Sequence, residues 1–183
     1  ADVFALLRIP FESEEAIEVS RKIAEHMYFA ATESSMEIAK SRKKYVAEYR
    51  RLLKKQNKYQ ESLKSETNDS NELEDLTEDE KSQMDTLKNN NFIYPDEVEK
   101  LPMSLAGAYS SFVGSEAHNG KLQFDLWDVQ PSEELKDDWD KLKSDIKKHG
   151  LRNSLLMAMM PTASTSQILG NNECIEPYTN NIY

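Results

Sequence analysis

The sequence predicts an α/β fold, and two patterns in its second half indicate this class. Residues 121–127 alternate apolar and polar side chains, which is the period of a half-buried strand. A short apolar run over 154–160 is typical of a fully buried strand, and a loop of small hydroxyl residues follows it. A helical pattern precedes this run and a second follows the loop, so the chain order predicts an α/β unit.

Composition limits the classes of function. The chain has 183 residues, enough for one domain with a core, and it is 38% hydrophobic and 31% charged. Its net charge of −10 excludes a general electrostatic attraction to nucleic acid or anionic lipid. No apolar run is long enough to cross a membrane, and the single cysteine, Cys174, fits a reducing compartment. We therefore expect a cytoplasmic protein without nucleic-acid or membrane partners.

Both ends of the chain predict a fragment of a longer protein. The chain opens at Ala1 without a methionine and already inside an apolar segment. It closes at Tyr183 without a charged tail. Neither end is typical of the solvated terminus of a complete domain, so we expect further sequence on both sides.

The first predicted element is a long helix that occupies residues 13–40. Ser13 can cap its first turn, and Glu14 and Glu15 stand favourably against the helix dipole. Apolar residues then recur at steps of three and four, which predicts one buried face. They are Val19, Ile23, Met27, Ala30 and Ala31.

Residues 41–105 form a charged segment that we expect to be helical and then disordered. The basic stretch 42–64 contains tyrosines and leucines, and it predicts a continuation of the helix. It could contact nucleic acid, although a solvated amphipathic helix fits the pattern better. The acidic, Ser/Asn-rich tract from Ser65 to Glu80 predicts a mobile surface loop.

A second helix is predicted over 77–89. Thr77 and Glu80 stand at the spacing of a capping box, in which each side chain binds the other residue's backbone amide. A run of three asparagines, 89–91, is expected to end this helix.

Residues 106–183 return to a globular composition. Pro131 and Ser132 predict the start of a helix with a basic last turn, and Gly150 predicts its end. Its expected buried stripe consists of Leu135, Trp139, Leu142 and Ile146. This helix precedes the predicted strand over 154–160.

The strongest candidate site is the loop 161–166, which leads into a short predicted helix over 166–169. Small side chains allow a close approach of the backbone, and the first amides of a helix are unpaired and point outward. The hydroxyl groups of Thr162, Ser164 and Thr165 add neutral donors. An acidic chain could hold a diphosphate in this way, and a simple helix cap is the alternative interpretation.

Other chemistry-bearing residues give weaker signals. Cys174 has no local base or partner cysteine, so an inert thiol is the expected state. His26, His118 and His149 are not spaced as metal ligands, and we predict no metal site in this chain.

Several stretches closely resemble the large, catalytic subunit of eukaryotic and viral class I ribonucleotide reductases. The most specific is the string MPTASTSQILGNNE at 160–173. The other similar stretches are 1–4, 10–13, 120–127, 150–156 and 175–179. The resemblance covers about residues 1–40 and 106–183, and residues 41–105 look like an insertion between two core elements.

The resemblance implies a ten-stranded α/β barrel, of which 1–40 and 106–183 would supply one flank. It implies reduction of ribonucleoside diphosphates to deoxyribonucleoside diphosphates by a radical mechanism. Thr162, Ala163, Ser164 and Thr165 match the loop that binds the substrate's diphosphate in this family. The family's reactive cysteines match no residue here, so the resemblance implies no catalytic residue in this fragment and no activity of the fragment alone.

The resemblance also implies cofactors and partners for the full enzyme. We expect a small subunit with a di-metal and radical cofactor, ATP and deoxynucleotide effectors, and thioredoxin or glutaredoxin as the reductant. A homodimer of large subunits is expected as well, and no cofactor is expected on this segment. Two alternatives remain open: a non-catalytic remnant or split-gene piece that acts only by assembly with other chains, and a helical interaction module built around the insertion.

Overall fold

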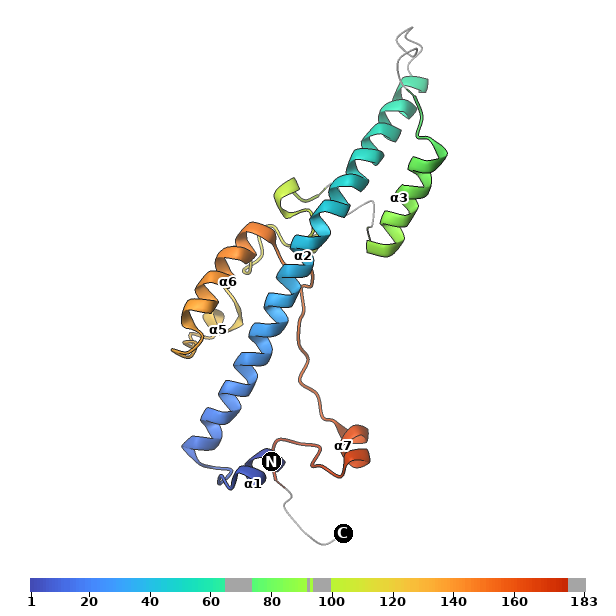
Figure 1. Cartoon of the computed structure of the whole chain (residues 1–183). Coiled ribbons are helices and arrows are strands. Elements are labelled where there is room, and N and C mark those ends of the chain that lie inside the picture. The colour runs from blue at the N-terminus through green and yellow to red at the C-terminus, as the bar shows by residue number, and fades with distance from the viewer. Residues whose placement is uncertain (65–73, 92, 94–99, 178–183) are drawn as a thin grey trace. The chain divides into compact units, whose positions relative to one another are not determined.

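The computed structural model describes residues 1–64, 74–91, 93 and 100–177, and the elements in this part of the chain are helical (Figure 1). They are α1 (Asp2–Leu7), α2 (Glu14–Lys64), α3 (Glu78–Asn91), the 3-10 turn η2 (Met103–Leu105), α5 (Gln123–Leu126), α6 (Lys136–His149) and α7 (Ala163–Leu169). The chain divides into two compact units. One comprises 1–31 with 156–183, and the other comprises 32–155.

Neither predicted strand is present in the described residues, so the α/β class predicted for this chain is not observed in its structure. Within 121–127 the structure has the helical turn α5 instead, because the Asp125 carboxylate accepts the Leu122 amide at 2.7 Å and closes a capping turn. Residues 154–160 carry no secondary structure. A strand exists only when a second strand pairs with it, and the described residues offer this segment no partner.

Helix α2 confirms the predicted long helix and its basic continuation as one element of 51 residues. The Ser13 hydroxyl accepts the Ala16 amide at 3.2 Å, so the predicted N-cap is present. The predicted buried face is wrong, because Ile23 and Met27 are 47% and 48% exposed. Periodicity identifies an apolar face but does not show which other segment covers it.

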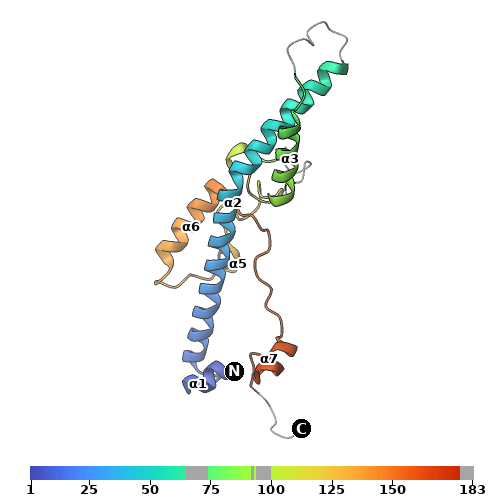
Figure 2. The ribbon, with the colours of Figure 1, turned by 45° about the vertical axis from the view of Figure 1, so that its right-hand side comes forward.

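The basic stretch of α2 forms an amphipathic helix, because one of its faces contributes to a core while most of its basic side chains stay exposed. Val46 and Tyr49 are buried together with Ile93 and Ala106. The partly buried side chains packed against this cluster are Leu53, Met84 and Leu87. Burial of these apolar groups holds α3 beside the C-terminal part of α2, an arrangement that Figure 2 shows clearly.

Helix α3 begins with the predicted capping box. The Thr77 amide donates to the Glu80 carboxylate at 3.0 Å, and the Glu80 amide donates to the Thr77 hydroxyl at 3.2 Å. Lys55 of α2 also reaches this carboxylate, at 2.7 Å. The acidic tract for which we predict a mobile loop lies largely in residues 65–73, outside the described residues.

Two arginines of α2 attach the chain that returns from α3. Arg42 donates from Nε to the Asn91 carbonyl at 3.0 Å, and Arg50 donates from Nη2 to the Leu101 carbonyl at 2.8 Å. Further along, Gly107 lies so close to α2 that a β-carbon would stand 1.8 Å from the Ala39 carbonyl oxygen. We call Leu101 to Gly107 the return segment, and these contacts fix its position along α2.

Helix α6 confirms three residues of its predicted stripe, because Trp139, Leu142 and Ile146 are buried. It begins at Lys136, later than Pro131 and Ser132 predict, so the fourth residue, Leu135, is the half-buried N-cap. Gly150 ends the helix at φ 80°, a conformation that favours glycine. The rings of Phe124 and Trp139 lie 4.9 Å apart, so α5 is packed on α6.

Candidate functional site

The four predicted phosphate-binding residues lie together in a single turn at the start of α7. Thr162 is the N-cap, and Ala163, Ser164 and Thr165 form the first turn of the helix. All four residues are exposed. The short helix therefore begins three residues earlier than predicted, and the candidate loop is itself its first turn.

Backbone amides at this turn are open to a ligand. The first helical hydrogen bond runs from the Ser166 amide to the Thr162 carbonyl at 2.9 Å. The amides of Ala163, Ser164 and Thr165 consequently have no acceptor within the helix. Adjacent amides at a helix start can bind one anionic oxygen or more, and the small Ala163 side chain leaves room for it.

The three hydroxyl groups of the turn differ in their hydrogen bonds. Thr165 donates from Oγ1 to the Thr162 carbonyl at 2.9 Å, and Thr162 makes a long contact of 3.5 Å to the Glu173 carbonyl. The Ser164 hydroxyl has no hydrogen-bond partner within the described part of the chain. Ser164 is therefore the side chain best prepared to donate to a ligand.

A second loop, 171–176, lies against the start of α7, and Asn172 organises it. The Thr162 amide donates to the Glu173 carbonyl at 3.4 Å, which joins the two loops. Asn172 donates from Nδ2 to the Glu176 carbonyl at 2.7 Å, and its own amide donates to the Asp2 carboxylate at 2.7 Å. Asn172 is not among the predicted site residues, although it lies in the string 160–173 and forms a polar pair with Asn171 directly after Gly170.

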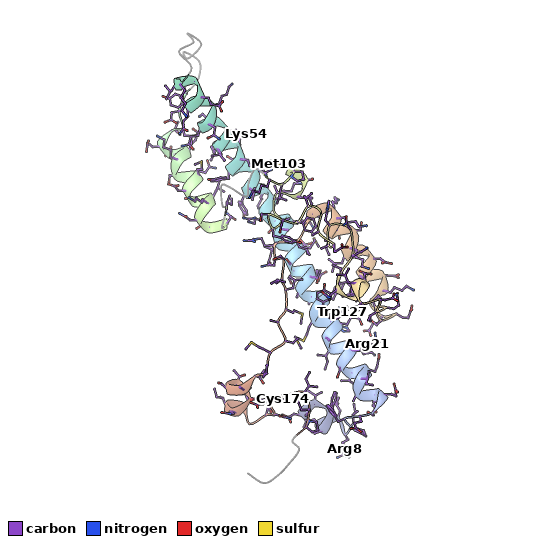
Figure 3. All side chains as sticks on the ribbon, turned by 180° about the vertical axis from the view of Figure 1, so that it is seen from behind. Arg8, Arg21, Lys54, Met103, Trp127 and Cys174 are labelled. Carbon is purple, nitrogen blue, oxygen red and sulfur yellow. The ribbon has the colours of Figure 1, made fainter. Side chains whose placement is uncertain are left out.

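Electrostatics at this turn depend on dipoles and not on cationic side chains. No lysine or arginine hydrogen-bonds to residues 162–165 within the described residues. Cys174 lies in the loop after α7 (Figure 3). Partial burial, followed by the nearby carboxylates of Glu176 and Glu173, raises the pKa of the Cys174 thiol. The raised pKa favours the protonated, less nucleophilic form of the thiol.

Neither a cluster of metal ligands nor a membrane-spanning helix is found in the described part of the chain. Across the described ranges, no group of three or more His, Cys, Asp and Glu side chains could hold a metal ion. Of the helices in the described ranges, none combines the length and the apolarity that a membrane span requires.

The sequence of this chain matches a known family over nearly its whole length. The family model "Ribonucleotide reductase, barrel domain" matches residues 1–94 and 100–183. The chain therefore belongs to the ribonucleotide reductases and is a portion of their barrel domain. A barrel domain is consistent with the predicted α/β class, whereas the elements of the described residues are helical.

Among its relatives, the chain is 39% identical to the ribonucleoside-diphosphate reductase large subunit of Plasmodium falciparum (isolate Dd2). It is 37% identical to the large subunit of Caenorhabditis elegans and to large chain 2 of Saccharomyces cerevisiae. Each alignment covers all 183 residues of this chain. The chain spans about 15% of the length of the curated relatives it matches.

Most of the segment interpreted as an insertion, 41–105, lies inside the ranges matched by the family model. A matched range can include residues that are inserted relative to the family. The insertion therefore stays a prediction.

Proposed function

We propose that this chain is the part of a ribonucleoside-diphosphate reductase large subunit that binds the diphosphate of the substrate. The ligand would lie at Thr162, Ala163, Ser164 and Thr165. The full subunit would reduce ribonucleoside diphosphates to deoxyribonucleoside diphosphates by a radical mechanism, in the cytoplasm. Family membership and the names of the relatives support the reaction class.

One observation carries the proposed site. The start of α7 presents three consecutive amides without acceptors in the helix, and the unpartnered Ser164 hydroxyl lies beside them. A diphosphate has several anionic oxygens, and charge-assisted hydrogen bonds from amides and hydroxyls are about twice as strong as neutral ones. Helix α7 has only seven residues, so these local donors, more than a long helix dipole, would supply the attraction.

In this proposal the remaining chemistry comes from other parts of the enzyme. A small subunit provides the di-metal and radical cofactor, and thioredoxin or glutaredoxin provides electrons. ATP and deoxynucleotides act as effectors, and two large subunits form a dimer. This chain positions the substrate and is inactive alone, because none of its residues matches the family's reactive cysteines.

The test is isothermal titration of cytidine diphosphate against the full-length subunit. In the Ala163→Leu variant, the larger side chain blocks the approach of phosphate to the amides, and we expect affinity to fall by about tenfold or more. Gln167→Leu is the matched control, because it adds an apolar side chain one turn later on the exposed side of α7.

An affinity of Ala163→Leu that stays within about twofold of the unmodified protein would show that this turn is only a helix cap. A full-length protein that assembles with other subunits but titrates no nucleoside diphosphate would instead support the non-catalytic remnant.

A further inference from the structure

The outer face of α2 carries a row of basic side chains, which we name the basic stripe. It consists of Lys40, Lys44, Arg51, Lys54 and Lys58. Their spacings of four, seven, three and four residues place all five on one face of the helix. The row is about 27 Å long at the rise of an α-helix.

The basic stripe faces away from the buried cluster of Val46, Tyr49, Ile93 and Ala106. Its five members are exposed, whereas Val46, Tyr49 and Leu52 on the opposite side of α2 are buried. Figure 3 shows Lys54 on the side of α2 away from α3. Within the described chain the stripe is therefore exposed along its length.

Within the described chain the charge of the basic stripe is poorly compensated. Lys40 pairs with Glu37 at 3.1 Å and Arg51 with Glu48 at 2.8 Å, and both pairs are largely exposed to water. Lys44, Lys54 and Lys58 make no ion pair with any described residue. Lys44 instead lies 4.8 Å from the centre of the Tyr45 ring. Pairs of like charge four residues apart destabilise a helix, so this arrangement costs stability when the protein is alone.

In the N-terminal part of α2, by contrast, basic side chains are paired with nearby carboxylates. There Arg21 bonds to Glu18 at 2.8 Å and to Glu25 at 3.4 Å, so the charges neutralise one another on the helix surface. Between Lys40 and Lys64, in contrast, the sequence has ten of the chain's 23 basic residues and two of its 33 acidic residues. The positive charge is concentrated on one segment of an otherwise strongly acidic chain.

We propose that the basic stripe is a docking surface for an acidic polypeptide segment of a partner protein. A single row of cations about 27 Å long matches one face of an acidic helix or about eight residues of extended chain. Glu48 within the stripe and Glu37 just before it would give the partner a register. A nucleic acid is the less favourable occupant, because a long polyanion would extend beyond the stripe over the rest of this acidic chain, whereas a short acidic segment need not.

The test measures binding of a fluorescent, glutamate-rich helical peptide to the full-length subunit by anisotropy. We expect binding at low ionic strength that weakens as salt is added, since exposed charges are screened within about 10 Å at 0.1 M salt. In the variant Lys44→Glu/Lys54→Glu/Lys58→Glu we expect the affinity for the peptide to fall by about tenfold or more. Titration of cytidine diphosphate should be unchanged.

The matched control is Lys136→Glu/Lys141→Glu/Lys148→Glu, which makes the same change in net charge on exposed lysines of α6. An equal loss in this control would show that net charge alone attracts the peptide, and the proposal would fail. It would also fail if the unmodified subunit does not bind the peptide, or if a single-stranded oligonucleotide binds the stripe more tightly. Circular dichroism checks that each variant is folded. If the three Lys→Glu changes unfold α2, Lys→Gln changes at the same positions are used instead.

Discussion

The hydroxyl groups at the start of α7 are chemically alike in the sequence but not in the structure. Thr165 already donates to the Thr162 carbonyl at 2.9 Å, so binding a phosphate would require it to exchange one hydrogen bond for another. Ser164 has no such bond to give up within the described chain. The sequence could predict the loop, because its small hydroxyl residues are adjacent in the chain. It could not show which hydroxyl is free to bind a ligand, because their hydrogen bonds depend on where the helix begins.

This difference predicts unequal effects on substrate binding. Loss of a hydrogen bond to a charged acceptor costs roughly 1.5–3 kcal/mol, so Ser164→Ala should weaken cytidine diphosphate binding by about ten- to a hundredfold. Thr165→Val should cost less, because its hydroxyl gives up an internal bond in order to bind. Calorimetric titration of both full-length variants measures the order. An equal or reversed order would contradict the assigned hydroxyl geometry.

Cys174 provides a test that depends on pH. Partial burial and the carboxylates of Glu176 and Glu173 raise the pKa of its thiol, so the thiolate forms only at a more alkaline pH than for an ordinary cysteine. We expect slow alkylation by iodoacetamide at neutral pH, with the rate rising at alkaline pH. Glu176→Gln should lower the thiol pKa and speed alkylation at neutral pH. Fast alkylation of the unmodified protein at neutral pH would show that the thiol is activated.

Among the elements, the contact between α2 and the return segment depends on a missing side chain. A β-carbon at Gly107 would lie 1.8 Å from the Ala39 carbonyl oxygen, and helix backbone cannot move aside easily. Gly107→Ala should therefore destabilise the protein by roughly 1–3 kcal/mol or more, measured by thermal unfolding of the full-length subunit. Gly114→Ala is the control, because no atom lies within 4 Å of its added β-carbon and only its backbone φ of 86° opposes it. Equal losses of stability in the two variants would mean that α2 and Gly107 can move apart to make room for the added β-carbon.

Elements with local signals were predicted well, and elements that need distant partners were not. The caps at Ser13 and Thr77 act within one turn, so the sequence is sufficient to place them. A strand needs a neighbour that may be far away in the chain, and alternation over 121–127 could not show that Asp125 closes a helical turn instead. The prediction of the buried face of α2 was wrong for the same reason, because the sequence of a helix does not show which other segment covers it.

At the scale of the whole molecule, large apolar side chains exposed on this chain indicate surface that the rest of the subunit is expected to cover. Leu155, Met160 and Ile168 are 88%, 76% and 82% exposed. Soluble proteins rarely leave such groups together in water, because burial of apolar surface is a main source of stability. The chain spans about 15% of its relatives' length, so the rest of the subunit is the expected cover.

The predicted strand over 154–160 can be tested in that larger context. Its backbone has no strand partner in the described chain, whereas pairing in the full subunit would protect its amides from exchange with solvent. Hydrogen exchange with mass spectrometry on the full-length subunit should show slow exchange over these residues. The exposed start of α7 serves as an internal reference for fast exchange. Equally fast exchange in both segments would show that 154–160 is not a strand.

The attachment of the return segment to α2 has an evolutionary consequence. The contacts at Arg42 with Asn91 and at Ala39 with Gly107 fix the base of the hairpin formed by residues 43–64 and α3. The distal part of the hairpin can therefore lengthen or shorten without moving that base. Related genes should tolerate losses of about seven residues, one helical turn from each arm, more readily than losses from one arm only. Such paired length changes would leave a recognisable record when orthologous genes from closely related species are compared.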